Sequence, residues 1–126
     1  MQKLGLALAA TLAVSAPAQA ETLKMATIAP SLGAAISMAT FANIVTKNVD
    51  GIEIEVAAGG AATLHMMEVG RGNLDMSMTS PVVYNLMSGG KAMYAKQADA
   101  PELAKNVNLL MWYPYGAYHF AVRADS

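Results

Sequence analysis

Residues 59–81, GGAATLHMMEVGRGNLDMSMTSP, decide the fold of this chain. The two glycines at 59–60 predict a loop, because glycine adopts positive φ angles and lets a backbone approach a ligand closely. Residues 62–69 have a helical apolar pattern, and the Gly-Arg-Gly-Asn run at 70–73 supplies a helix stop. Apolar and polar side chains then alternate over 74–79, which predicts a half-buried strand. The stretch therefore reads as loop, helix, turn and strand.

A second helix start follows this strand. Ser80 is a capping residue, and Pro81 fits the first helical position because its missing N–H group would have no helical partner there. Two helices are therefore predicted to begin near residues 60 and 80, each directly after a strand. Helix N-termini favour anions, since their N–H groups are unpaired and carry partial positive charge. This pattern is typical of a binding site and contains no obvious catalytic group.

The same patterns predict the remaining elements. In chain order they are a strand at 22–28, a helix at 34–49, a strand at 52–56, a helix from 81 to the glycine pair at 89–90, a helical turn at Pro101, and strands at 107–113 and 117–123. The expected apolar face of the helix at 34–49 consists of Ile36 or Met38, Phe41, Ile44 and Val45. For the helix at 62–69 it consists of Leu64, Met66 and Met67, and for the helix that begins at 81 it consists of Val82, Val83, Leu86 and Met87. The alternation of strands and helices predicts an α/β fold with a mostly parallel sheet flanked by helices. In such sheets ligands bind beyond the carboxyl ends of the strands, which here are 29–33, 58–61 and 79–81.

The first 20 of the 126 residues have the features of an export signal. Lys3 provides the positive start, residues 4–14 form a short apolar run, and Ala-Gln-Ala at 18–20 is a cleavage site, so Glu21 is the expected mature N-terminus. An uncleaved anchor is the alternative, but the run is shorter than the roughly 20 residues that span a bilayer. Residues 21–126 are therefore expected in the periplasm.

Composition narrows the classes of function. Without Lys3 the chain carries seven basic and nine acidic side chains, a net charge of −2, which argues against nucleic acid as a partner. The sequence has no cysteine, which excludes disulfides and a cysteine-linked lipid anchor. The mature 106 residues can form one small domain, and the abrupt end after Arg123 suggests an incomplete one.

From residue 22 onward, the chain resembles the solute-binding proteins of TRAP transporters, specifically the TAXI group. The glycine pair at 59–60, the run GRGNLDMSMTSP at 70–81 and the ending YHFAVRADS at 118–126 carry the resemblance. It implies a periplasmic-binding-protein-like (type II) fold of two lobes, of which residues 21–126 would be the first and the second would be missing. It also implies a small solute, an organic acid or amino acid, and the membrane permease subunits as partners. TAXI proteins commonly carry Gly-Ser-x-x-Asn after the second strand, whereas residues 59–63 read Gly-Gly-Ala-Ala-Thr; Thr63 or His65 is the candidate for the Asn position.

The candidate ligand-binding residues follow from these loops and from nearby aromatic side chains. They are Ser31, Gly59, Gly60, Thr63, Thr79, Ser80, Tyr84 and Tyr113. Helix capping is the alternative for the serines and threonines, and core packing is the alternative for the tyrosines. No cofactor is expected, and the two histidines and the paired methionines make weak cases for a metal.

The sequence thus predicts a non-enzymatic solute receptor that feeds a transporter. A periplasmic enzyme on the same fold is one alternative, but no Gly-x-Ser-x-Gly elbow or nucleophilic cysteine is present. A sensor or scaffold module is the other.

Overall fold

The computed structural model describes residues 20–112 and 123–124. Their elements, in order, are β1 (Glu21–Thr27), α1 (Gly33–Asn48), β2 (Ile52–Ala58), α2 (Ala62–Arg71), β3 (Met76–Ser77), α3 (Pro81–Ser88), the 3₁₀ turn η1 (Ala92–Tyr94) and α4 (Ala100–Ala104). The proposed leader, apart from residue 20, and most of the strand predicted at 117–123 lie outside the described residues. Among the described residues, no helix combines the length and the apolar character needed to cross a bilayer.

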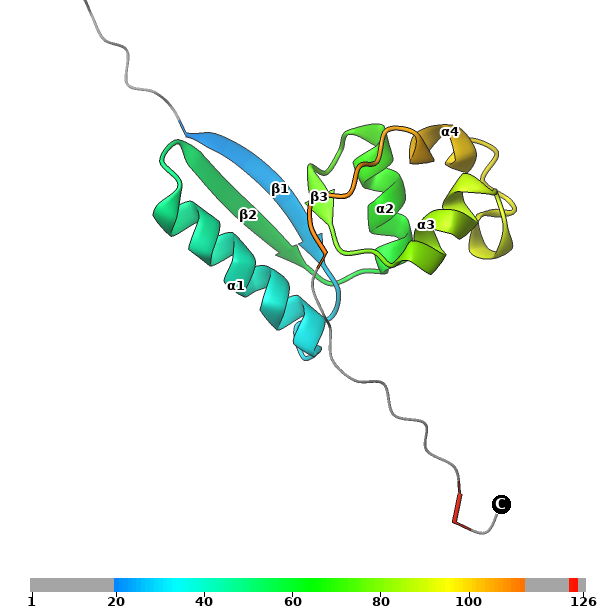
Figure 1. Ribbon diagram of the computed structural model, residues 1–126, viewed down its shortest axis with the longest axis horizontal. Helices are drawn as coiled ribbons and strands as arrows, with labels where there is room; N and C mark the ends of the chain where they lie inside the picture. Colours follow the sequence, from blue (N-terminus) through cyan, green and yellow to red (C-terminus); the bar gives the residue numbers. More distant parts are fainter. Residues whose placement is uncertain (1–19, 113–122, 125–126) are drawn as a thin grey trace, which may run out of the picture.

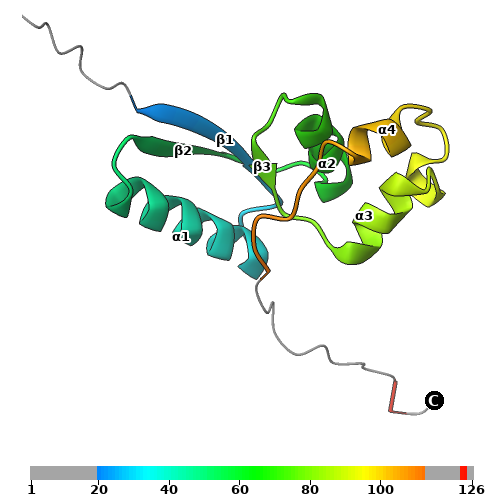
Figure 2. The same cartoon turned by 45° about the horizontal axis from the view of Figure 1, so that its top comes forward.

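The three strands form one parallel sheet in the order β2-β1-β3. Met25 of β1 is the Cα partner of Val56 on one side and of Met76 on the other. Figures 1 and 2 show α1 along β1 and β2, and the helices α2, α3 and α4 gathered beyond β3. The predicted α/β fold with a parallel sheet flanked by helices is therefore confirmed.

Local sequence signals account for the helix ends. The Ser80 Oγ accepts a hydrogen bond from the Val83 N–H at 3.2 Å, and Pro81 begins α3, as predicted. Gly72 ends α2 with a φ of 77°, the left-handed conformation that glycine adopts without steric cost. A short helix with Pro101 in its first turn is also found.

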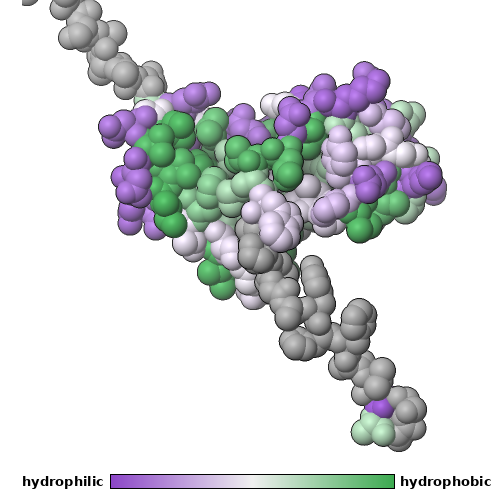
Figure 3. Space-filling view, in the orientation of Figure 1, coloured by the Kyte–Doolittle hydropathy of each residue, from purple (hydrophilic) through white to green (hydrophobic). Residues whose placement is uncertain are grey.

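The described chain buries two separate apolar clusters. The sheet cluster joins β1, α1 and β2 through Met25, Met38, Ala42 and Ile54. The helical cluster joins α2, α3, η1 and α4 through Met66, Met67, Met87, Tyr94, Ala100 and Ala104. Figure 3 shows apolar side chains gathered along α1 and across the middle of the molecule, with hydrophilic side chains toward both ends.

Three of the predicted helix faces need correction. Ile44 and Ile36 of α1 are exposed, because α1 packs against the sheet through Ala34, Ala35, Met38 and Ala42. Leu64 of α2 is exposed, since the buried side of that helix consists of Met66, Met67 and Gly70. Val82 of α3 is also exposed, whereas Met87 is fully buried.

Two strand predictions were also wrong in extent. The strand predicted at 74–79 is reduced to Met76–Ser77. Residues 107–112 of the predicted strand at 107–113 contain no strand and pair with none of the three strands of the sheet. A strand is stable only when a neighbour accepts its backbone hydrogen bonds, and β3 is too short to offer a full edge. Val107 packs on the helical cluster instead, and Leu109 and Leu110 are exposed.

Candidate functional site

The strand order creates a switch point between β1 and β3. The chain passes from β1 to β2 on one side, and then from β2 to β3 on the other side of β1. In open parallel sheets, ligands bind in the crevice beyond the carboxyl ends of the two strands where the order reverses. Here this crevice lies between residues 28–33 after β1 and residues 78–80 after β3.

A groove of about 1620 Å³ opens at this switch point. One wall is formed by side chains of β1, β3 and residues 34–41 of α1, and the other by the segment 106–112. Six of the ten methionines of the chain line it: Met25, Met38, Met66, Met76, Met78 and Met111. We call it the methionine groove.

The structure separates the predicted ligand-binding residues into two sets. Thr79, Ser80 and Tyr84 line the methionine groove. Ser31, Gly59, Gly60 and Thr63 do not line it. Tyr113 lies outside the described residues. The candidates thus stay predictions, and the geometry groups three of them at the switch point.

The hydroxyl groups at the groove already have protein partners. The Thr79 hydroxyl donates to the Met66 Sδ at 3.0 Å, and the Ser80 Oγ is the α3 cap. The Tyr84 hydroxyl donates a long bond of 3.5 Å to the Ala104 carbonyl. An exposed hydroxyl of this kind can still exchange or add a partner, because each hydroxyl has one donor and two acceptor positions. Capping and ligand contact are therefore compatible at Ser80.

The glycine loop lies next to β1 but outside the groove. The Gly59 N–H donates to the Thr27 carbonyl at 3.0 Å, which holds the end of β2 against the end of β1. Gly60 has a φ of 86°, and a Cβ at this position would lie 2.5 Å from the His65 Nε2. The positive backbone angle favours glycine there, and any larger residue would also have to displace the end of the His65 side chain. Thr63 contacts the helical cluster through its backbone carbonyl, which accepts a hydrogen bond of 2.9 Å from the hydroxyl of the buried Tyr94. Burial raises the pKa of the Tyr94 hydroxyl.

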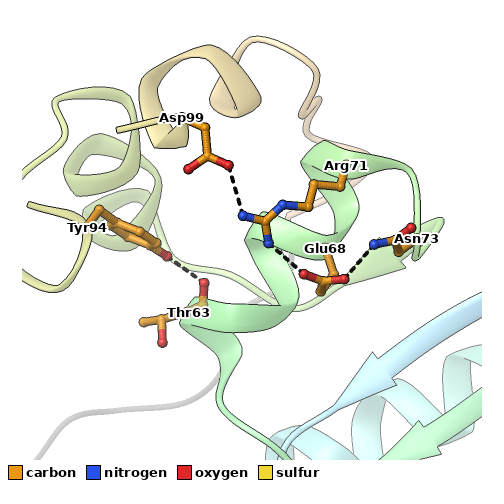
Figure 4. Close-up of polar contacts among 6 residues, drawn as sticks. All are labelled: Thr63, Glu68, Arg71, Asn73, Tyr94 and Asp99. Carbon is orange, nitrogen blue, oxygen red and sulfur yellow. Dashed lines mark hydrogen bonds and ion pairs between the residues drawn. The ribbon is translucent and has the colours of Figure 1, made fainter. Parts of the chain in front are cut away.

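Arg71 has an internal role in the structure. Its guanidinium contacts the Glu68 carboxylate at 2.8 Å and the Asp99 carboxylate at 2.9 Å, so it ties the end of α2 to the start of α4 (Figure 4). Hydrogen bonds from Asn73 and then Arg71 hold the pKa of Glu68 below its ordinary value of 4.5. The hydrogen bond from Arg71 likewise lowers the pKa of Asp99 from 3.8. Both arms of the guanidinium are therefore engaged with carboxylates of the described chain.

Sequence reasoning did not single out Ser37 and the asparagines near residue 107. Ser37 lines the groove from the first turns of α1. Asn106 and Asn108 line the opposite wall. The only usable signal was the position of Ser37 close to a predicted helix start. Within residues 20–112 and 123–124, no group of three or more acidic, histidine or cysteine side chains is arranged to hold a metal ion.

The chain matches no protein family model, no curated protein and no solved structure. The resemblance to the TAXI group therefore stays a prediction.

Proposed function

We propose that this chain is the first lobe of an extracytoplasmic solute receptor of the TRAP type, TAXI family, with a periplasmic-binding-protein-like (type II) fold. It binds a small organic acid or amino acid, delivers it to the membrane permease subunits, and performs no chemistry on it. The supporting observation is the methionine groove, which opens at the switch point of a parallel sheet with Thr79, Ser80 and Tyr84 in its lining. The proposed periplasmic location follows from the leader pattern at residues 1–20.

The groove has the general features of a small-molecule site. Such sites are concave, mostly apolar and supplied with a few polar groups that orient the ligand. Here the hydroxyl groups of Thr79 and Ser80 sit at the carboxyl end of β3, where it leads into α3. In a two-lobed receptor this edge faces the second lobe, so a solute held here would be enclosed when the lobes close.

A thermal-shift screen of the chain against organic acids and amino acids tests this function. At about ten times the dissociation constant, a bound solute should raise the Tm by roughly 5 °C. Tyr84→Phe and Thr79→Val should reduce the shift, whereas Thr40→Val, at an exposed α1 residue outside the groove lining, should leave it unchanged. The panel is screened up to saturating millimolar concentrations, because a single lobe covers less of a ligand than a closed pocket does. The proposal fails if no organic acid or amino acid stabilises the chain under these conditions.

A further inference from the structure

The lining of the methionine groove is unusually rich in methionine. Six methionine side chains contribute to it, together with Leu23, Phe41 and Val83. Methionine is unbranched and flexible, so a methionine-rich surface adapts its shape to apolar ligands. The groove volume of about 1620 Å³ also exceeds the roughly 300–1,000 Å³ of ordinary ligand pockets. The surface therefore offers space for an apolar body of some length.

The charged residues of the groove argue against solutes that carry two carboxylates. Among the described residues that line it, Asp75 is the one charged residue, and no lysine, arginine or histidine is present. The Asp75 Oδ2 accepts the Lys24 N–H at 2.7 Å, at the start of β3. The hydroxyl groups of Thr79 and Ser80 lie at the other end of that strand. A second carboxylate on the solute would therefore meet thioethers and a like charge, and an unpaired charge among apolar groups is costly.

We propose that the solute is an amphiphilic monocarboxylate, whose single polar head lies at Thr79 and Ser80 and whose apolar chain lies along the methionine groove. This inference rests on the proposed function and narrows its solute class. It separates acids with an acyl or aryl body from dicarboxylates and from polar amino acids.

Trp112 provides an internal reporter for the test. It is the only tryptophan of the chain, it lines the groove, and it is 76% exposed, so an apolar ligand should shift its emission to shorter wavelength. The chain is titrated with butanoate, hexanoate, octanoate, succinate and 1-octanol, and emission and Tm are followed together. Affinity should rise about fourfold for each added methylene that becomes buried, and octanoate should bind at least about tenfold more tightly than succinate.

Paired methionine variants show whether the groove is the binding surface. Met76→Gln replaces a groove thioether with a polar group of similar length and should lower octanoate affinity at least about threefold. Met93→Gln, at the exposed η1 turn, is the matched control and should change nothing. Circular dichroism of both variants checks that the fold is retained. Equal loss in both variants, or loss in neither, would overturn the assignment to the groove.

The ligand series distinguishes failure of this inference from failure of the proposed function. If succinate binds as tightly as octanoate, or affinity does not depend on chain length, the apolar-body inference is wrong while acid binding stands. If 1-octanol binds as tightly as octanoate, the groove takes apolar chains but the proposed recognition of an acid is wrong. If no compound changes the emission of Trp112 or the Tm, both are wrong.

Discussion

The Thr79 hydroxyl donates a hydrogen bond to the Met66 Sδ at 3.0 Å, and this contact joins the loop after β3 to helix α2. Met66 is 1% exposed and belongs to the helical cluster, whereas Thr79 lies at the carboxyl end of the sheet. Both residues also line the methionine groove. The contact therefore fixes the candidate site against the helical half of the molecule.

Thr79→Val should weaken this link without changing the volume of the side chain. We expect the free energy of unfolding to fall by roughly 0.5–1.5 kcal/mol, the usual net contribution of one hydrogen bond. Urea denaturation followed by circular dichroism measures the change. Thr22→Val, at an exposed position of β1, is the control. A Thr79→Val chain as stable as the parent would show that the bond to sulfur contributes nothing.

Thr46 protects the outer edge of β2. Its Oγ1 accepts the Ile54 N–H at 2.9 Å, on the side of β2 that has no neighbouring strand among the described residues. Open edge strands pair with other chains, and natural proteins block them with local partners. Thr46→Val should cost about 1 kcal/mol of stability and increase self-association. Sedimentation velocity compares it with Thr40→Val on the same helix. An unchanged monomer fraction in the Thr46 variant would contradict this role.

Gly70 lies inside α2 and faces α4. An added Cβ would lie 2.7 Å from the Leu103 carbonyl oxygen and 2.9 Å from the Leu103 Cβ. Glycine to alanine in a helix interior normally stabilises by about 1 kcal/mol, but here overpacking should reverse the sign. We expect Gly70→Ala to destabilise by roughly 1–3 kcal/mol. Asn85→Ala, an exposed position of α3, should be neutral or slightly stabilising. Stabilisation by Gly70→Ala would mean that α4 can move away without cost.

The Arg71 network predicts a pH dependence of stability. The pKa values of Glu68 and Asp99 are lowered from 4.5 and 3.8 in the folded chain, so their contribution is present at neutral pH. It is lost as pH falls through the folded values, because both carboxylates must then take up protons. Between about pH 5 and pH 3 the Tm should fall less steeply in Arg71→Met than in the parent chain. Lys105→Met, which breaks the more exposed pair with Glu102, is the control. Equal slopes in all three chains would remove Arg71 as a source of the pH dependence.

The local elements were predictable because their signals are local. Alternation in β1 and β2, the Ser80–Pro81 start of α3 and the glycine stop of α2 depend on neighbouring residues alone. The helix faces were less predictable, because Ile36, Leu64 and Val82 are apolar yet largely exposed in the described fold. Residues 107–112 are apolar enough for a strand, yet strand formation requires a neighbouring edge that the sequence of the segment does not reveal.

The composition of the candidate site depended on strand order, which the sequence pattern did not contain. The order β2-β1-β3 places the glycine loop at 59–60 on the far side of β1 from β3. Because of this strand order, the methionine groove is lined by Thr79, Ser80 and Tyr84 but not by Gly59 and Gly60. Ser37 lies in the groove lining beside Ala34 and Met38, two of the residues through which α1 packs.

Amide chemical-shift mapping of the labelled chain tests the central claim, a solute site at the switch point, most directly. The chain is titrated with the organic acids and amino acids of the thermal-shift panel. The account predicts saturable shifts concentrated at residues 28–33 and 78–84, with smaller changes along 107–112, and none along the exposed face of β2 at Glu53 and Glu55. Shifts that map elsewhere, or that are spread evenly over the chain without saturation, would contradict it.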